Sequence, residues 1–337
     1  MSTVNTIKGP ISSADLGRVL VHEHVFTADI EILLNYGKDF DEEAEVAEAI
    51  RKMNAIKASG IDTIIDLTVI GLGRYIPRIQ KVAAQTDLNI VVSTGCYTLD
   101  EVPMPFRNVG PGLMFDRPDP MPGLFLGDVV EGIADTGVFA GELKCAIDKA
   151  GLTKGVERVM RAVGQVNLAS GTPISVHTDS RSESGLVAQR VLADEGVDLR
   201  DVIIGHSGDT TDLEYLMKLA DAGSILGMDR FGMSILLSDE KRMATVIELI
   251  RLGYVEQLTM SHDCYCWTNL AVGGRPSVPG HSHLVVSEKV IPALIEAGVT
   301  RDQVEIMLVE NPRRHFEGAA ERFAARQVVA DPAAAGH

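Results

Sequence analysis

The 337-residue sequence predicts an α/β fold, namely a single closed (β/α)8 barrel of the TIM type. Eight short apolar segments alternate with segments of helical periodicity, and no linker or shift in composition divides them. The apolar segments are continuously hydrophobic, as is typical of parallel strands that helices cover. Eight such units favour a closed barrel over an open, doubly wound sheet. The first strand is not followed by Gly-x-Gly-x-x-Gly, so nothing supports dinucleotide binding.

The predicted strands are rich in Val, Ile and Leu, and the first of them contains the sequence Val-Leu-Val-His-Glu-His-Val. In chain order, the strands are expected at residues 19–25, 62–68, 88–96, 138–146, 173–177, 202–206, 224–228 and 257–263.

A helix is expected after each strand. The first places Val46, Ile50 and Met53 at helical spacing and ends at Gly60. The helices are expected at residues 41–59, 75–85, 126–135, 156–166, 184–195, 213–222, 241–252 and 285–297, with a final helical segment at 302–316. Long loops follow the third and eighth strands. The barrel domain is expected to span residues 1–325, and the Ala-rich tail at 326–337 is expected to fray.

The composition excludes several classes of partner. A formal net charge of −16 argues against nucleic acid and anionic membranes, which require basic patches, and suits a small-molecule substrate. The four cysteines show no disulfide-framework spacing and indicate reduced thiols. Residues 1–12 lack the pattern of a signal peptide, and no apolar run is long enough to span a membrane. We expect a soluble, cytoplasmic protein.

Ionisable side chains gather at the C-terminal ends of the predicted strands. In a barrel these ends meet on one face, where active sites are built. Because side chains alternate along a strand, His22 and His24 face one side and Glu23 the other. Taken singly, each histidine could be an ordinary core residue. Together, four imidazoles and one carboxylate are the ligand set expected for one or two zinc-like ions. The candidate residues are His22, His24, Lys144, His177, His206 and Asp263.

The other histidines are not expected to bind metal. His262 neighbours Asp263 and therefore points the other way, which favours a supporting role. His281, His283 and His315 lie in a loop or in the terminal helix.

Lys144 has two interpretations. A neutral lysine can take up carbon dioxide as a carbamate, whose two oxygens can bridge two cations, although an ordinary lysine is almost entirely protonated at pH 7. The alternative is an ion pair with Glu142 or Asp66, which spacing does not reject.

The order and spacing of these residues resemble the phosphotriesterase family of the amidohydrolase superfamily. The stretches at residues 63–68, 204–209, 261–263 and 311–314 strengthen the resemblance, which extends from about residue 6 to residue 316. Within the family the sequence is most similar to the phosphotriesterase-like lactonases, on the segments at residues 70–74 and 227–232 and on Tyr97.

The resemblance implies two divalent metal ions, zinc first, with cobalt, iron or manganese as alternatives. His22, His24 and Asp263 would hold the more buried ion, and His177 and His206 the more exposed one. Carbamylated Lys144 and a hydroxide would bridge the two ions. The resemblance also implies a homodimer.

The resemblance also implies the opening of lactone rings, most of all those of N-acyl homoserine lactones (quorum quenching), with weak promiscuous hydrolysis of organophosphate triesters. The bridging hydroxide would attack the carbonyl, and Asp263 would shuttle the proton. Tyr97 would help to polarise the carbonyl, and Arg230 would line the pocket. Trp267 would either cover the acyl chain or anchor a loop.

Other functions remain open. The main activity could be that of a phosphotriesterase or a carboxylesterase. A mononuclear deaminase of the same superfamily would need a His-x-x-Glu arrangement, which accompanies neither His177 nor His206. A non-catalytic metal-binding barrel would be signalled by a lost ligand, and none is missing. Two carboxylates depart from the family pattern: Glu142, which needs a partner if buried, and Asp179.

Overall fold

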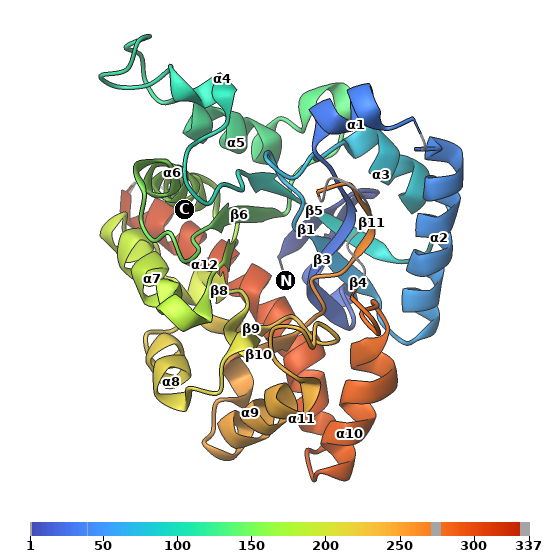
Figure 1. Ribbon diagram of the computed structural model, residues 1–337. Coiled ribbons are helices and arrows are strands. Elements are labelled where there is room, and N and C mark those ends of the chain that lie inside the picture. The colour runs from blue at the N-terminus through green and yellow to red at the C-terminus, as the bar shows by residue number, and fades with distance from the viewer. Residues whose placement is uncertain (1, 39, 271–277, 331–337) are drawn as a thin grey trace, which may run out of the picture.

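A curled parallel sheet forms the centre of the computed structural model, which describes residues 2–38, 40–270 and 278–330. Its nine strands are joined by hydrogen bonds in the order β10, β9, β8, β7, β6, β5, β4, β3 and β11 (Figure 1). The strands β3 to β10 correspond to the eight predicted strands and follow one another in chain order. The predicted α/β barrel is therefore confirmed.

The strands β3 to β10 lie within or close to their predicted ranges, whereas β11 lies where a loop was predicted. Their bounds are β3 Val19–Thr27, β4 Thr63–Asp66, β5 Asn89–Gly95, β6 Glu142–Ala146, β7 Ile174–His177, β8 Val202–Ile204, β9 Ile225–Met228, β10 Leu258–Met260 and β11 Tyr265–Thr268.

The barrel closes where the chain after β10 runs alongside β3. The backbone N–H of Asp263 donates to the carbonyl of His22 at 3.0 Å, and that of His24 donates to the carbonyl of Cys264 at 2.8 Å. β11 continues this pairing, with Tyr265 in register with His24. The barrel is thus closed by backbone hydrogen bonds of residues 263 and 264, which follow the end of β10 at Met260.

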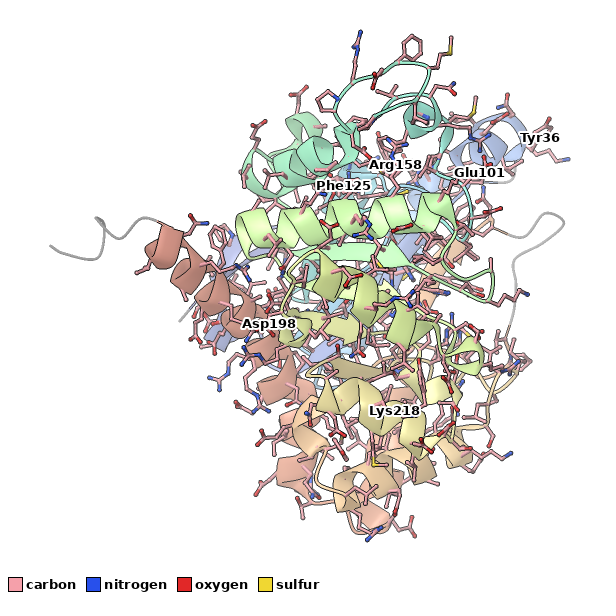
Figure 2. The ribbon with its side chains drawn as sticks, turned by 90° about the vertical axis from the view of Figure 1, so that its left-hand side faces the viewer. Tyr36, Glu101, Phe125, Arg158, Asp198 and Lys218 are labelled. Atoms are coloured by element: carbon pink, nitrogen blue, oxygen red, sulfur yellow. The ribbon has the colours of Figure 1, made fainter. Side chains whose placement is uncertain are left out.

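Helices surround the sheet, and the core lies between the two layers (Figure 1). Figure 2 shows the side that α6, α7 and α8 cover, with Arg158 on α6 and Lys218 on α8. None of the described helices is both long and apolar enough to cross a membrane. The helices are α1 Ile30–Tyr36, α2 Glu42–Ala58, α3 Ile76–Ala83, α4 Met104–Arg107, α5 Pro120–Val130, α6 Lys154–Ser170, α7 Ser184–Asp194, α8 Leu213–Asp221, α9 Asp239–Arg251, α10 Ile291–Glu296, α11 Arg301–Glu305 and α12 Asn311–Ala330.

Helix α5 begins earlier than its predicted range of residues 126–135. It begins at Pro120, because Asp119 caps its first turn by accepting from the N–H of Met121 at 3.0 Å. Proline at the first position is a helix-start signal, since its missing N–H would have no partner there. At the other end of the chain, α12 extends to Ala330, into the segment predicted as a tail, and residues 331–337 lie outside the described residues.

An N-terminal hairpin that the sequence analysis did not predict lies against the barrel. β1 (Thr3–Thr6) and β2 (Gly9–Ser12) pair antiparallel. Val4 of β1 and Phe316 of α12 belong to a buried cluster with residues of the central strands, among them Val19 of β3. Val19 begins its strand, so the hairpin and α12 pack at the N-terminal end of the barrel, opposite the predicted site.

Asn311 gives a test of how α12 is fastened to the barrel. Its buried amide donates to the carbonyls of Val255 at 2.8 Å and Leu258 at 2.6 Å. Asn311→Ala removes both bonds and is expected to lower the free energy of unfolding by about 2–3 kcal/mol, measured by urea denaturation. The control is Asn54→Ala on α2, an exposed residue with one bond of 3.2 Å to Gln85, where a change under about 0.5 kcal/mol is expected. Equal losses in the two variants would contradict this role of Asn311.

Candidate metal centre

The C-terminal ends of five strands bring the six predicted ligands together. Two of the residues that follow strands, His206 and Asp263, adopt left-handed backbone conformations with φ of 63° and 54°. Such strain in residues other than glycine is typical of functional sites. The six residues are His22 and His24 on β3, Lys144 on β6, His177 at the end of β7, His206 after β8 and Asp263 after β10.

The first part of the centre consists of His22, His24 and Asp263, whose ligand atoms all lie within 4.8 Å of one another. Asp263 Oδ1 is 3.5 Å from His22 Nε2 and 3.3 Å from His24 Nε2. Two imidazole nitrogens and a carboxylate oxygen at this spacing fit a divalent cation such as zinc.

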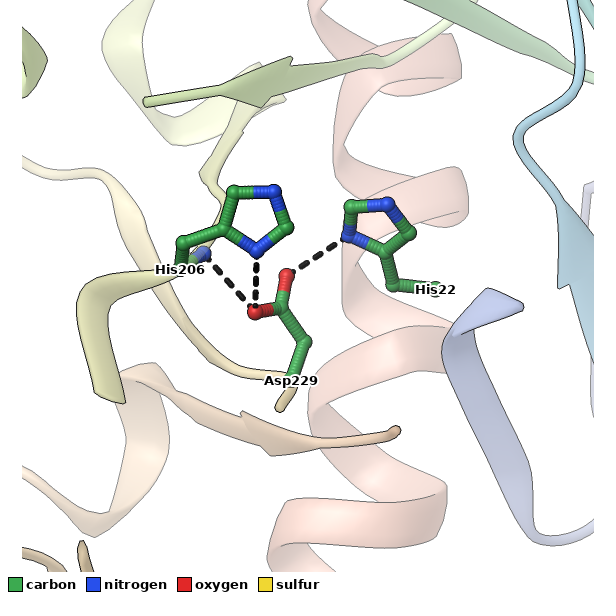
Figure 3. Close-up of side chains that lie close together, drawn as sticks. All are labelled: His22, His206 and Asp229. Carbon is green, nitrogen blue, oxygen red and sulfur yellow. Dashed lines mark hydrogen bonds and ion pairs between the residues drawn. The ribbon is translucent and has the colours of Figure 1, made fainter. Parts of the chain in front are cut away.

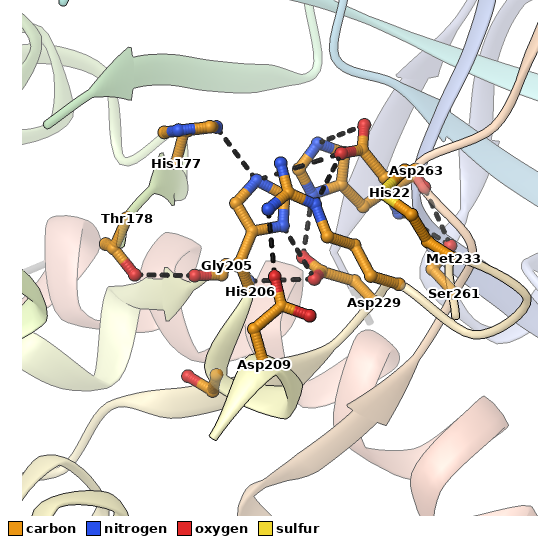
Figure 4. A network of polar contacts seen from close by, with 12 residues as sticks. His22, His177, Thr178, Gly205, His206, Asp209, Asp229, Met233, Ser261 and Asp263 are labelled. Carbon is orange, nitrogen blue, oxygen red and sulfur yellow. Dashed lines mark hydrogen bonds and ion pairs between the residues drawn. The ribbon is translucent and has the colours of Figure 1, made fainter. Parts of the chain in front are cut away.

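The second part consists of His177 and His206, which face each other in Figure 4. His206 Nε2 lies 2.9 Å from His177 Nδ1. The other oxygen of Asp263, Oδ2, is 3.9 Å from His206 Nε2, so the carboxylate reaches both parts of the centre.

Asp229 orients two of these rings from behind (Figure 3). Its Oδ2 accepts from His22 Nδ1 at 2.7 Å, and its Oδ1 accepts from His206 Nδ1 at 2.9 Å and from the backbone N–H of His206 at 2.8 Å. Burial alone would raise the pKa of Asp229, but the two histidines hold it below its usual range. Both rings therefore carry their proton on Nδ1 and present an unprotonated Nε2 to the centre.

Asp148 orients the ring of His177. His177 Nε2 donates to Asp148 Oδ2 at 2.7 Å, which leaves Nδ1 unprotonated. Burial lowers the pKa of His177 to about 4 and also lowers the pKa of His22 and His206, so the rings are neutral at pH 7. The facing nitrogens of His177 and His206 are then two lone pairs at 2.9 Å, an arrangement that a shared cation stabilises. The donor set thus fits divalent metal ions.

Lys144 lies beside the first part of the centre, with Nζ 3.4 Å from His22 Nε2. Its side chain is 1% exposed, and burial lowers its pKa to about 8. Among the described residues, neither predicted ion-pair partner contacts it. Glu142 Oε1 instead accepts from Ser175 Oγ at 2.8 Å, and Asp66 Oδ1 accepts from the N–H of Thr68 at 3.0 Å. Lys144 is therefore buried without either of the partners that would keep it an ordinary ammonium ion.

Arg230 is the cation nearest Asp263. Its Nε donates to Asp263 Oδ2 at 2.9 Å, and its Nη1 donates to Asp209 Oδ2 at 2.9 Å. Asp209 in turn accepts from Arg242, a fully buried arginine, at 2.7 Å. On the other side of the centre, the Tyr97 ring stands edge-on to His177, with ring centroids 5.2 Å apart. Burial raises the pKa of Tyr97, so its hydroxyl stays protonated.

Trp267 lies in β11, in register with Phe26 of β3. Its side chain is 6% exposed and stands edge-on to the Phe40 ring, with centroids 4.7 Å apart. This packing favours the role of a structural anchor over that of a cover for the acyl chain. Residues 271–277 of the long loop predicted after the eighth strand lie outside the described residues.

The two unusual carboxylates have structural partners. Glu142 Oε1 also lies 3.1 Å from Nε2 of His315, so a residue of α12 supplies the missing partner of this buried acid. Asp179 caps the short turn Ser180–Ser182 by accepting from the N–H of Ser182 at 3.2 Å. The other oxygen of Glu142, Oε2, is buried and has no hydrogen-bond partner among the described residues.

Sequence reasoning missed the carboxylates behind the histidines. Asp229 directly follows β9, which ends at Met228, so the rule that selected Asp263 would also have selected it. Asp148 lies two residues after the end of β6, and the rule selects only residues at the strand end itself. Asp209 follows His206 by three residues, and no spacing rule connects it with Arg230 or Arg242.

Comparisons with known proteins agree with this geometry. A model of the phosphotriesterase family matches residues 2–316. A phosphotriesterase homology protein of Mycobacterium tuberculosis is 50% identical over 320 residues, which are 94% of this chain and 98% of that protein. An aryldialkylphosphatase of Saccharolobus solfataricus is 35% identical over 313 residues, which are 92% and 98% of the two chains. The solved structure of a phosphotriesterase from Mycobacterium tuberculosis superposes with a TM-score of 0.91 at 50% identity, covering 94% of this chain and 98% of that one.

Asp229→Asn tests the orienting role of the carboxylate. An asparagine keeps the size of the side chain, but its NH2 group would face one of the two ring N–H groups, so one histidine loses its acceptor. Metal affinity, measured by competition with a chelator, is expected to fall about 10- to 100-fold. The matched control is Asp221→Asn on α8, an exposed carboxylate that accepts from Tyr254 at 2.9 Å and should leave metal affinity unchanged. Unchanged affinity in Asp229→Asn would contradict the role.

Proposed function

The chain belongs to the phosphotriesterase family of metal-dependent hydrolases, and we propose that it opens lactone rings, those of N-acyl homoserine lactones first among them. The observation that carries this proposal is the position of Asp263, which reaches both parts of the metal centre and is held by Arg230 at 2.9 Å. When a lactone ring opens, the ring oxygen departs as an alkoxide and needs a proton. A carboxylate beside the nucleophile can supply one, because it has just accepted one.

The residues that would hold the two cations are His22, His24 and Asp263 on one side and His177 and His206 on the other. Lys144, as a carbamate, would lie between them. When bound, the cations acidify a water molecule and polarise the carbonyl. Zinc suits these nitrogen and oxygen donors best, and cobalt, iron and manganese are the alternatives.

The chain's own residues supply the proton transfer and the binding. Asp263 takes the proton of the attacking water and returns it to the ring oxygen as the C–O bond breaks. Arg230 stays charged at every physiological pH, keeps Asp263 ionised and holds Oδ2 in place. The protonated hydroxyl of Tyr97, beside His177, can donate to the carbonyl oxygen as negative charge develops there.

The carbamate on Lys144 is supported by the environment of the amine. Carbon dioxide reacts only with the neutral amine, forming a C–N bond and releasing one proton. Burial and the lack of an ion pair with Glu142 or Asp66 favour that neutral form.

A homodimer is the assembly we propose. Large apolar side chains stand exposed on α1 and on the loop after α4: Leu34 is 79% exposed, Tyr36 74% and Met114 80%. Figure 2 shows Tyr36 projecting from the edge of the molecule. A second copy of the chain that covers these side chains would remove their apolar surface from water. For location we propose the cytoplasm, because the cysteines at 96, 145, 264 and 266 are free thiols.

Phosphotriester hydrolysis as the main activity is the second candidate. It rests on the relative from Saccharolobus solfataricus, an aryldialkylphosphatase at 35% identity. The same centre suits both reactions, because a tetrahedral phosphorus also needs a polarised oxygen and an activated water. An aryl leaving group, however, departs as a weak base and gains little from the proton on Asp263.

A substrate comparison tests the proposed function. The metal-reconstituted enzyme is assayed on acyl homoserine lactones of several chain lengths, on a dialkyl aryl phosphate and on an aryl ester. The best lactone is expected to exceed the phosphate in kcat/KM by about 100-fold, which corresponds to about 2.7 kcal/mol of transition-state stabilisation. A phosphate or aryl ester that is turned over faster than every lactone would assign the main activity to that substrate instead.

Lys144→Met tests the bridging carbamate. Methionine fills the same space without an amine, so the variant is expected to lose one or both metal ions, counted by elemental analysis. Reconstitution of the wild-type apo-enzyme should also be faster with bicarbonate. The control is Lys149→Met, an exposed lysine on the loop after β6 that should keep the full metal content. Two metals and full activity in Lys144→Met would show that the bridge does not exist.

A further inference from the structure

Glu23 is a fully buried carboxylate that the proposed reaction does not use. It lies on β3 between His22 and His24, but it points to the opposite side of the strand, away from the metal centre. A buried carboxylate is costly unless several donors stabilise it, so its partners indicate why it is there.

The partners of Glu23 flank Asp263 on both sides. Oε1 accepts from the backbone N–H of His262 at 3.0 Å and lies 2.7 Å from the hydroxyl of Ser261. Oε2 accepts from the backbone N–H of Cys264 at 3.1 Å. The carboxylate therefore holds the chain immediately before and immediately after Asp263.

The ring of His262 adds a donor whose proton the structure locates. Its Nε2 accepts from the backbone N–H of Val286 at 2.9 Å, so the proton of the neutral ring lies on Nδ1. That Nδ1 donates to Glu23 Oε1 at 2.6 Å. His262 thus connects Glu23 to Val286, at the far end of the loop that follows β11.

Two further histidines join the same group. His281 Nε2 donates to the carbonyl of His262 at 2.7 Å, and His283 Nε2 lies 3.7 Å from Glu23 Oε2. His281 and His283 are therefore directed at Glu23 or at the residue bound to it. Residues 281–286 thus contact the barrel at Glu23 and His262.

The backbone of Asp263 needs such a restraint. Its φ of 54° is left-handed, a conformation that costs a residue other than glycine about 1–3 kcal/mol and persists only where the surroundings enforce it. The bond from Glu23 to the N–H of Cys264 fixes the peptide group that follows Asp263. The peptide group before Asp263 is held by the bond from His281 to the carbonyl of His262, and the bond from Glu23 to the N–H of His262 holds the next peptide group back. Without them the side chain of Asp263 would not be held toward His22 and His24.

We propose that Glu23 is a positioning residue for Asp263: its carboxylate enforces the left-handed turn that directs Asp263 into the metal centre and fastens the loop after β11 to the same point. The proposal rests on Asp263 being a ligand and proton acceptor, as in the proposed function. Glu23 itself contacts neither metal nor substrate.

Glu23→Gln is the test. Glutamine keeps the size of the side chain, but its NH2 group cannot accept from the N–H of Cys264. With cobalt bound in place of zinc, the variant is expected to show an altered visible absorption spectrum and about 10- to 100-fold faster metal loss to a chelator. For turnover, kcat is expected to fall more than KM rises. These metal readouts do not depend on the substrate, so they remain informative even if the chain does not hydrolyse lactones.

The matched control is Asp201→Asn. Asp201 is also a fully buried carboxylate, with Arg322 Nε at 2.6 Å and Asn167 Nδ2 at 3.2 Å, but it lies at the start of β8, away from the metal centre. Asp201→Asn should lower the melting temperature without changing the cobalt spectrum. The proposal is overturned if Glu23→Gln lowers only the melting temperature, or if both variants change the spectrum alike.

A second pair of variants covers the case in which Glu23→Gln does not fold. His262→Leu removes the ring donor, whereas His262→Asn retains an N–H group near the position of Nδ1. The leucine variant should change the cobalt spectrum and the asparagine variant should restore part of it. Identical spectra for the two variants would overturn the proposal.

Discussion

The metal centre depends on the closure of the barrel between β3 and the chain after β10. Two backbone hydrogen bonds, from Asp263 to His22 at 3.0 Å and from His24 to Cys264 at 2.8 Å, join segments that are far apart in sequence. Ser261 adds a third connection, since its hydroxyl oxygen accepts from the N–H of His22 at 3.0 Å. Asp263 can meet the two histidines only when this seam is closed. Metal binding and folding are therefore coupled, and bound metal should stabilise the closed barrel.

Charge is arranged in layers around this seam. The neutral imidazoles of His22, His177 and His206 form the inner layer. The carboxylates of Asp229 and Asp148 lie behind them and determine which ring nitrogen is free. Beyond Asp263, Arg230 and Asp209 alternate in sign. Buried charges are costly unless each has a partner, and this alternation supplies one. The ligands are therefore oriented before a metal ion binds, which lowers the free-energy cost of binding.

The sequence was sufficient to predict the barrel and the gathering of the six candidate residues on one face, because both follow from local rules. Continuous apolar strands identify a covered parallel sheet, and the barrel brings strand ends such as those at His177 and His206 onto one face. Helix boundaries were less exact, as at Pro120, where a cap and a proline define a start that apolar periodicity does not show.

Contacts between residues remote in sequence could not be predicted. The pairing of Glu142 with His315 connects β6 to α12 across 173 positions, and no spacing rule joins them. Glu23 was correctly placed on the opposite side of β3 from its neighbours, but its partners follow from closure of the barrel and not from its own segment. Trp267 was left with two roles because only its packing against Phe40 distinguishes them.

A crystal structure of the zinc-loaded enzyme, with anomalous diffraction data at the zinc edge, would test the central claim most directly. The account predicts two zinc ions, one contacting His22, His24 and Asp263 and the other contacting His177 and His206. It also predicts density for a carboxyl group attached to Lys144 Nζ that reaches both ions. A single zinc ion, or an unmodified Lys144 that contacts neither ion, would contradict it.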